Sequence, residues 1–500
     1  MDYVIGCDVG SQGTKAILLS ATGEFIAEAY EGYHIDYPHP MWAEQPVDRW
    51  LDALTLAIRR LLYESGIRTE DVHALSLATQ VDGVIPIDSS GQPLYPAIIW
   101  MDRRASKQCE LVRQSPGEKE IFHLTGLNLD AYHVAPKIRW LAEQQPKIYE
   151  SAEHFLLPGS YLAYYLTGEL AIDYSNASST MLFDVHSKTW SAIMCDAFEI
   201  DVHKLASLGP STAALGNLRQ VVAEKLGLHA NTLVMIGCGD EHAACLGAGI
   251  IQSGLVGDIA GTAEPVCTAH PTPIFDQTRL VETHCHADPD LWLLENPGFV
   301  SGGNYRWLRD QFAKGESYAT LDAEAARVPP GAEGLAFLPS LMGALAPTWN
   351  ESARGTYAGF TLAHTRGHFV RALLEGSAYA VRDITSQMGI IGLELHEMRV
   401  MSGGAKSRLW NQIKADVTGL QISVPEITET TALGAAFVAL VGIGAYATLT
   451  DASNHIVNIR ERIDPDPATK SAYDEAYERY RQTYFALVPV FEQAARRNSR

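Results

Sequence analysis

The chain opens with two short apolar runs separated by a small polar segment. Tyr3 to Cys7 and Ala16 to Leu19 have the length and composition of buried strands. The sequence DVGSQGTK between them carries glycines that permit a tight turn and side chains that supply hydrogen-bond donors. The pattern therefore predicts a hairpin with this segment at its tip, followed by an Ala-Thr-Gly-Glu turn.

Helical and strand-like periods alternate along the rest of the chain. DRWLDALTLAIRRLLYES has helical spacing, VHALSLAT is typical of a strand, and GQPLYPAIIWMDRRA gives a turn, a strand and the start of another helix. This alternation indicates an α/β protein with at least partly parallel sheets. The late run ALGAAFVALVGIGAYATL is short for a membrane span, so we interpret it as a buried helix and its turn. The C-terminal SAYDEAYERYRQTYFALVPVFEQAARR predicts one or two amphipathic helices with core aromatic residues.

The second half repeats the arrangement of the first. TLVMIGCGDEHAACLGAG contains a strand followed by a glycine turn with an aspartate, and GLVGDIAGTAEPVCTAH is again a strand, a Gly-Thr turn and a strand. Two similar halves suggest a duplicated domain with a ligand cleft between the copies. We place the boundary near Gly247, which gives a first domain over residues 1–246 and a second over 247–500.

Composition narrows the class of partner and the compartment. The chain has 500 residues with 47% hydrophobic content, which suggests about two to three domains. A net charge of -21 disfavours nucleic acid and anionic membrane surfaces, because both attract basic proteins. Seven cysteines without a repeated CxxC spacing indicate a reducing, cytoplasmic location. The first apolar run is short and ends in Asp8, so we expect no signal peptide.

The hairpin tip is a candidate phosphate site. Gly10 and Gly13 let another group approach the backbone, while Ser11, Gln12 and neighbouring residues supply donors. Simple turn glycines are the alternative, but Asp8 favours the functional interpretation. A carboxylate that ends a buried strand needs compensation, and Mg²⁺ brought by a nucleotide would supply it. Neither a GxxxxGK[ST] nor a GxGxxG pattern is present here.

Other glycine turns carry further candidates. Asp240 precedes an Ala-rich helix, where it is either a base favoured by the helix dipole or a helix cap. Gly261 and Thr262 either contact phosphate or turn a hairpin. VMSGGAKSRLWNQIKADVTG predicts a strand ending at Met401–Ser402 and a helix beginning near Lys406 to Leu409, with a flat glycine surface suited to adenine or ribose, or only a tight connection.

Two segments extend this set. FVSGGNYRWLRDQF places another Gly pair before an aromatic, Arg-bearing helix. THCHAD contains His284, Cys285 and His286, which could suggest a metal site. Adjacent and alternating ligands on one strand rarely complete a tetrahedral site, so we interpret this segment as structural.

These segments together resemble the FGGY family of carbohydrate kinases, which includes glycerol kinase and xylulokinase. The resemblance covers essentially the whole chain. It implies an α/β fold of two actin-like (ribonuclease-H-like) ATPase domains flanking a central cleft, with sugar held by the first domain and ATP mainly by the second. Six segments occur in the order and spacing of the family: Asp8 to Lys15, Gln80 to Gly83, Trp100 to Arg103, Gly239 to Glu241, Gly261–Thr262, and Gly403 to Asn411.

The resemblance also implies a role for each matched residue. Asp240 is expected to be the general base, and Asp8 the acidic residue that works with Mg²⁺. The implied nucleotide contacts are Ser11, Gln12, Gly13, Lys15, Gly261, Thr262, Gly302, Arg306, Gly403, Gly404 and Arg408. The implied sugar contacts are Gln80, Val81, Asp82, Trp100, Tyr132 and Glu241. This inventory supplies what phosphoryl transfer needs: positioning, charge neutralisation and one base.

Within the family, YHIDYPHPMWAEQPVDRW resembles xylulokinases. It predicts transfer of the γ-phosphate of ATP to a ketose, with D-xylulose and D-xylulose 5-phosphate as the leading pair. Xylulokinases usually carry methionine-histidine where this chain has Val81–Asp82, and asparagine where it has Glu241. Ribulose or another ketose, a polyol such as erythritol, or an autoinducer-type signalling sugar therefore stays open.

An alternative from a different class is a non-catalytic, ATP-binding sensor. The joint presence of Asp8 and Asp240 favours the enzyme. The expected partners are a small-molecule sugar and ATP, without nucleic acid or membrane, and a homodimer is left open.

Overall fold

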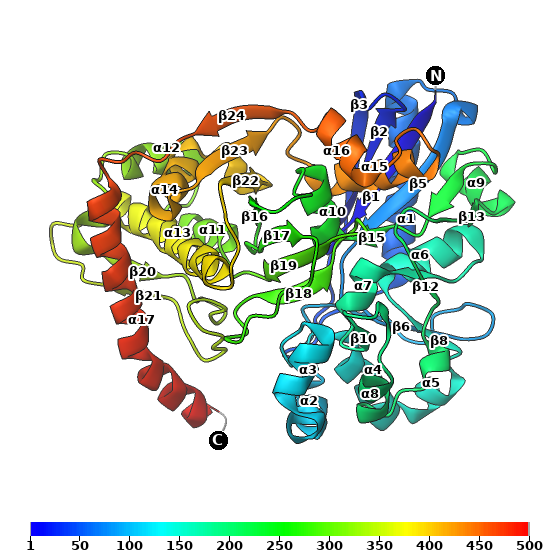
Figure 1. Cartoon of the computed structure of the whole chain (residues 1–500), viewed down its shortest axis with the longest axis horizontal. Coiled ribbons are helices and arrows are strands. Elements are labelled where there is room, and N and C mark those ends of the chain that lie inside the picture. The colour runs from blue at the N-terminus through cyan, green and yellow to red at the C-terminus, as the bar shows by residue number, and fades with distance from the viewer. Residues whose placement is uncertain (1, 499–500) are drawn as a thin grey trace.

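Two seven-stranded sheets form the framework of the chain, which the computed structural model describes over residues 2–498 (Figure 1). The first sheet has the order β13-β14-β5-β1-β2-β3, with β15 beside β5. Its strands β1, β2 and β3 are antiparallel neighbours, whereas β5 runs parallel to β1. The bounds are β1 (Tyr3–Val9), β2 (Gly13–Ser20), β3 (Phe25–Gly32), β5 (Val72–Thr79), β13 (Ala214–Asn217), β14 (Leu233–Met235) and β15 (Cys238–Gly239).

The second sheet repeats this plan. Its order is β18-β19-β17-β16-β22-β23-β24. Strands β16 and β17 form an antiparallel hairpin, and β22 runs parallel to β16, as β5 does to β1. The bounds are β16 (Leu255–Ile259), β17 (Val266–His270), β18 (Glu282–Cys285), β19 (Trp292–Asn296), β22 (Glu397–Met401), β23 (Gln421–Pro425) and β24 (Ile459–Ile463).

Helices α10 (Asp240–Gly247) and α15 (Thr430–Gly442) pack against each other between the two sheets (Figure 1). Small residues permit the close approach. A Cβ on Gly434 would lie 2.0 Å from the Ala243 carbonyl oxygen, and one on Gly247 would lie 2.0 Å from that of Thr430. Helix α15 also lies on β1 and β5, and α16 (Leu449–Ile456) joins the same apolar cluster. The other face of the first sheet is covered by α1 (Val47–Ser65).

The chain therefore crosses between the lobes more than once. Helices α15 and α16 follow the boundary expected near Gly247, yet they complete the core of the first sheet. Conversely, Cys285 of β18 belongs to the apolar core formed by the first sheet, α1 and the helices of the first lobe. Phe275 and Trp292 also pack against this core. The Thr283 N–H donates to the Gly126 carbonyl at 3.0 Å, which joins the two halves directly.

A helical region between β5 and β13 forms the lower part of the first lobe (Figure 1). Its helices are α2 (Ser106–Val112), α3 (Glu118–Thr125), α4 (Val134–Gln144), α5 (Pro146–Ser151), α6 (Pro158–Thr167), α7 (Tyr174–Ser178) and α8 (Ala192–Ala197). Helix α9 (Gln220–Leu226) follows β13. The second lobe is covered by α11 (Gly302–Phe312), α12 (Tyr318–Ala325), α13 (Arg366–Ile390), α14 (Arg408–Thr418) and α17 (Lys470–Asn498).

Most of the elements expected from periodicity are present. The predicted helix and strand of residues 48–65 and 72–79 are α1 and β5, and the late apolar run begins with the buried helix α15. The first hairpin is also present, but its strands extend further and leave only Gly10 to Gln12 outside them. Hydrogen bonding across the hairpin thus places Asp8 within the strand, opposite Lys15. No helix within residues 2–498 is long and apolar enough to span a membrane.

Candidate active site

The hairpin tip holds Asp8 at the edge of the first sheet. The turn is closed by the Gly10 N–H, which donates to the Gly13 carbonyl at 3.1 Å, and by the Tyr33 hydroxyl, which donates to the Gly10 carbonyl at 2.5 Å. Burial raises the pKa of Asp8 to about 8, and the charges of Asp240 and Glu429 add to the shift while Lys15 opposes it. The structure thus brings the two predicted catalytic carboxylates within electrostatic reach of each other.

Lys15 lies at the N-terminus of α15. Its Nζ lies 2.8 Å from Glu429 and 3.9 Å from Glu28. Glu429 is the N-cap residue of α15, so the ion pair connects the hairpin to the helix that lies between the sheets. A contact of Lys15 with phosphate, as predicted, would have to compete with this pair.

A hydrogen-bonded network joins the tip to the predicted sugar residues. Trp100 Nε1 donates to the Ser11 hydroxyl at 2.8 Å, and that hydroxyl lies 3.5 Å from Gln80 Oε1. Gln80 Nε2 donates to Gln45 Oε1 at 2.9 Å, while Gln45 Nε2 donates to the Ser11 carbonyl at 2.8 Å. Gln45 is fully buried, and the sequence analysis did not single it out. Its position one residue before Pro46, ahead of a predicted helix, carried no sign of this role.

Asp240 is the first residue of α10. Its Oδ1 accepts the N–H of Glu241 at 2.9 Å. Burial raises the pKa of Asp240 to about 7, the backbone N–H groups oppose the shift, and the charge of Asp82 adds to it. Burial raises the pKa of Glu241 to about 8, with the charge of Asp240 as the next cause. The favourable helix position is therefore outweighed by desolvation, which leaves Asp240 suited to exchanging a proton near neutral pH.

Two of the predicted sugar residues, Val81 and Asp82, lie beside this carboxylate. Asp82 has a left-handed backbone with φ of 57°, and its Oδ1 lies 3.2 Å from His133 Nδ1. Lys137 Nζ donates to the Asp82 carbonyl at 2.6 Å, which fixes the backbone there. Val81 lies beside Gly239, because a Cβ on that glycine would come within 2.7 Å of Val81 Cγ1. The segment is thereby held against the start of α10.

Tyr132 lies in the same region, at the end of a loop in the first lobe. The Arg103 guanidinium lies 4.9 Å from the centre of its ring and pairs with Asp130. Burial raises the pKa of Tyr132 well above its usual value, and the charges of Glu282 and Asp82 add most to the shift after burial. Tyr132 is therefore close to both the predicted sugar segment and to β18 of the second lobe.

The nucleotide residues predicted for the second lobe meet at the turn between β16 and β17. Gly302 N–H donates to the Gly261 carbonyl at 3.1 Å, and Gly404 N–H donates to the Ala260 carbonyl at 2.8 Å. A Cβ on Gly302 would lie 2.3 Å from the Gly261 oxygen. The Thr262 carbonyl accepts a hydrogen bond from the Gly303 N–H at 3.1 Å. Glycine is required where α11 and the segment before α14 approach this turn.

The two arginines predicted to line the nucleotide are less closely tied to this turn. Arg306 is exposed on α11. Arg408 donates to Glu461 of β24 at 2.9 Å, and three-quarters of its side chain is exposed. Gly403 has open space where a Cβ would project. Contacts of these three residues with nucleotide stay predictions.

A buried ion triad supports the turn from behind. Lys414 of α14 lies 2.5 Å from Asp258 of β16 and also pairs with Glu264, which follows Thr262 by two residues. All three side chains are fully buried. The triad ties the helix after Gly404 to the strand before Gly261, so it positions both predicted nucleotide segments.

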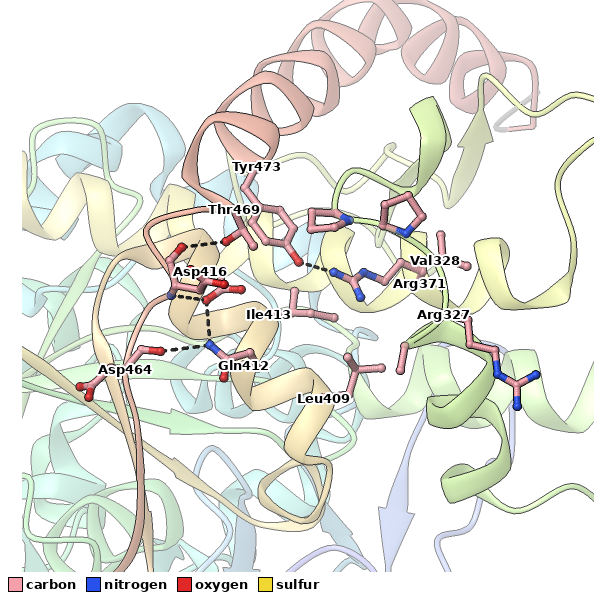
Figure 2. A pocket seen from close by; sticks show the side chains of 14 residues that line it. Arg327, Val328, Arg371, Leu409, Gln412, Ile413, Asp416, Asp464, Thr469 and Tyr473 are labelled. Atoms are coloured by element: carbon pink, nitrogen blue, oxygen red, sulfur yellow. Dashed lines mark hydrogen bonds between the residues drawn. The ribbon is translucent and has the colours of Figure 1, made fainter.

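A separate cavity of about 580 Å³ lies in the second lobe among the segment after α12, helices α13 and α14, and the start of α17 (Figure 2). None of the predicted catalytic or binding residues lines it. Its polar groups bond to one another: Arg371 donates to the Tyr473 hydroxyl, and Gln412 Nε2 donates to Asp416 Oδ1 at 2.8 Å. The cavity gives no indication of a catalytic role.

The carboxylate oxygens of Asp8 are suitable ligands for a divalent cation that arrives with phosphate. The half-buried carboxyl of Asp8 lies near two other acids, and the neighbouring Lys15 is already paired. Within residues 2–498 no group of three or more His, Cys, Asp or Glu side chains could hold a metal ion. Mg²⁺ at Asp8 would therefore need phosphate and water oxygens as its other ligands.

Comparison with known proteins identifies the family. The N-terminal domain of the FGGY family of carbohydrate kinases matches residues 3–247, and the C-terminal domain matches residues 259–443. Xylulose kinase of Lactococcus lactis subsp. lactis is 30% identical over 97% of this chain and 97% of its own length. Glycerol kinase of Burkholderia vietnamiensis is 32% identical over 90% of this chain and 91% of its own length.

A solved structure agrees with these matches. Gluconate kinase from Lactobacillus acidophilus superposes with a TM-score of 0.91 at 24% identity, covering 98% of this chain and 99% of the other. The predicted fold class, two actin-like (ribonuclease-H-like) domains of α/β type, and the predicted enzyme class, a carbohydrate kinase, are both confirmed. The three proteins differ in the substrate that each name gives. The chain belongs to the FGGY family of carbohydrate kinases.

Proposed function

We propose that this carbohydrate kinase transfers the γ-phosphate of ATP to a hydroxyl group of a ketose, with D-xylulose as the first candidate and D-xylulose 5-phosphate as its product. The observation that best supports this proposal is that Asp240, whose pKa is raised to about 7, lies close enough to Asp8 of the hairpin for its charge to raise the pKa of Asp8. Another ketose, a polyol or a signalling sugar is the alternative acceptor for the same site.

Asp240 would take the proton from the acceptor hydroxyl as the bond to phosphorus forms. Its position at the start of α10, fixed by the Glu241 N–H, points to this role, and burial keeps its proton affinity near that of a neutral-pH base. Asp8 would hold Mg²⁺, which neutralises charge on the phosphates when it is bound. The donors of Ser11, Gln12 and the Gly261–Thr262 turn would bind the β- and γ-phosphates.

The acceptor would lie between the two lobes, against Asp82, Tyr132, Glu241 and the Gln80–Trp100 network. Hydroxyl groups satisfy such a site, because carboxylates and amides accept or donate several hydrogen bonds. The first lobe would therefore contribute most sugar contacts and the second lobe most nucleotide contacts. The xylulose kinase similarity along nearly the whole chain makes D-xylulose the first candidate.

The test is ADP release from Mg²⁺-ATP with a panel of pentuloses, hexuloses, tetritols and glycerol. We expect turnover on D-xylulose, and a loss of about 10²–10⁴-fold in kcat for Asp240→Asn with ATP affinity retained. Asp310→Asn, at an exposed position paired with Arg309, is the matched control and should leave turnover unchanged. Unchanged turnover in Asp240→Asn would refute the assigned base. Silence of the wild-type chain across the panel would instead favour an ATP-binding sensor.

A further inference from the structure

A cluster of acids lies beside the proposed base, and most of its members are buried residues on two strands that the sequence analysis did not assign to the sugar. The antiparallel register pairs Glu282 of β18 directly with Glu295 of β19. His284 Nε2 lies 3.3 Å from Glu295 and 3.8 Å from Glu282. The Glu295 carboxyl also hydrogen-bonds with that of Glu241, the residue after Asp240. We call Glu241, Glu282, His284 and Glu295 the acid cluster.

The acid cluster is poorly compensated by the protein itself. Glu282, Glu295 and His284 are 0%, 2% and 4% exposed. Glu282 Oε2, Glu295 Oε2 and both ring nitrogens of His284 have no hydrogen-bond partner among the described residues. No lysine or arginine of residues 2–498 forms an ion pair with the three glutamates. Buried polar groups are normally satisfied, so the free oxygens of Glu282 and Glu295 indicate a ligand with hydrogen-bond donors.

The acid cluster lies next to residues predicted to bind the acceptor. Glu241 follows the base directly, and the charge of Asp82 acts on Glu241 as well as on Asp240. The charges of Glu282 and Glu295 both add to the raised pKa of Tyr132, a predicted sugar contact. Asn128 of the first lobe donates to Glu282 Oε1 from its backbone N–H at 2.7 Å and from Nδ2 at 2.9 Å. The acids are thus held where the two lobes meet around Asp240.

The chemistry of the acid cluster discriminates between ligands of the same shape. Hydroxyl groups can donate to its free carboxyl oxygens. A ligand carboxylate has no proton to donate to these oxygens. Its charge would act on Glu241 and Glu295 in the same direction as the neighbouring acids, which already raise the pKa of both carboxyls. A metal ion is a poor alternative occupant, because no three or more His, Cys, Asp or Glu side chains among the described residues are arranged so that they could hold one.

We propose that the acid cluster of Glu241, Glu282, His284 and Glu295 is a specificity determinant of the acceptor site, which admits uncharged polyhydroxy ketoses or polyols and excludes aldonates. This inference rests on the proposed kinase function and names the class of its acceptor. It separates this chain from a kinase acting on a sugar acid, although the overall fold matches that of a gluconate kinase.

Five-carbon ligands of the same configuration test the proposal: D-xylulose, xylitol and D-xylonate. Dissociation constants from titration calorimetry, together with ADP release, are compared for the wild-type chain, Glu282→Gln and Glu295→Gln. We expect D-xylonate to bind at least about 100-fold more weakly than the better neutral ligand. Each amide variant should narrow that ratio by about 10-fold or more, because the amide keeps the shape, cannot ionise and can donate a hydrogen bond to a ligand carboxylate. Asp383→Asn, which changes a buried acid in the second lobe, is the control and should leave the ratio unchanged.

Three results would overturn the specificity proposal. The first is that D-xylonate binds as tightly as the better neutral ligand or more tightly. The second is a ratio of dissociation constants that neither amide variant changes. The third is that no neutral ketose or polyol binds when these ligands and the corresponding aldonates are all tested. Turnover on an aldonate would overturn it while leaving the kinase assignment intact. Neutral ligands that bind with the expected ratio but release no ADP would support it and refute the proposed transfer.

Discussion

Asp240 shows at the scale of a single residue how surroundings set chemistry. Its sequence context, a glycine turn before a helix, predicted the position that the structure shows. The direction of its pKa shift depends on burial and on Asp82, which is far away in the chain. From the sequence alone, only the effect of the helix end, which favours the ionised carboxylate, could be predicted. The same limitation applies to Glu282 and Glu295, which become neighbours only through the register of two strands.

The raised pKa of Asp240 predicts an acidic limb in the rate. A base acts only when deprotonated, so kcat/KM should rise with pH up to about 7 and fall nearly 10-fold per unit well below that value. Asp82→Asn removes a charge that raises this pKa, and should move the limb to lower pH. The measurement is kcat/KM from pH 5 to 9 at saturating Mg²⁺-ATP, with Asp310→Asn as the control. A profile that stays flat to pH 5 would contradict the assignment.

Gly404 provides a second residue-scale prediction. Alanine there would bring its Cβ within 2.4 Å of the Ala260 Cβ and 3.1 Å of the Ala260 carbonyl oxygen, so the segment before α14 would have to move from the Gly261 turn. We expect Gly404→Ala to raise KM for ATP by about 10-fold with a smaller change in KM for sugar. Gly389→Ala, in open space on α13, is the matched control. Equal KM values for ATP in the two variants would show that the turn does not position nucleotide.

At the scale of elements, the sequence predicted β22 and α14 from a strand that ends in glycines before an amphipathic helix. It did not predict that Lys414 lies inside, because a lysine in such a helix is usually solvated. Two distant acids, Asp258 and Glu264, make its burial tolerable. Local patterns therefore predicted the elements, whereas the partners that fix one element on another depend on the tertiary fold.

Lys414→Met tests the ion triad that joins α14 to β16. It leaves two buried carboxylates without their cation, so we expect a loss of about 3–5 kcal/mol in the free energy of unfolding. Adding Asp258→Asn and Glu264→Gln to this variant should restore part of the loss, because the uncompensated charges are then absent. Chemical denaturation is the measurement, and Lys470→Met, which alters an exposed pair with Asp474, is the control. A variant as stable as the wild type would mean that the triad contributes little.

At the scale of the whole molecule, two sheets of the same plan are joined by α10 and α15, and α15 and α16 from the second half of the chain cover the first sheet. The duplication was visible in the sequence as a repeated hairpin with an aspartate or a Gly-Thr turn. The exchange of α15 and α16 into the first lobe was not visible, because an apolar run predicts burial without naming the surface that it covers. The proposed active site depends on this arrangement, since Glu429 at the start of α15 holds Lys15 of the first hairpin.

A fragment of residues 1–246 should therefore fail to fold alone, although it carries a complete sheet order. It lacks α15 and α16, which cover Val4, Ile17 and Ala74 in the intact chain. Thermal unfolding followed by circular dichroism should show no cooperative transition for the fragment, because this apolar face would be exposed to water. Co-expression with residues 247–500 is the control, and should restore a soluble complex with a cooperative transition. If the isolated fragment unfolds cooperatively at a temperature near that of the full chain, the exchanged helices are dispensable for the first lobe.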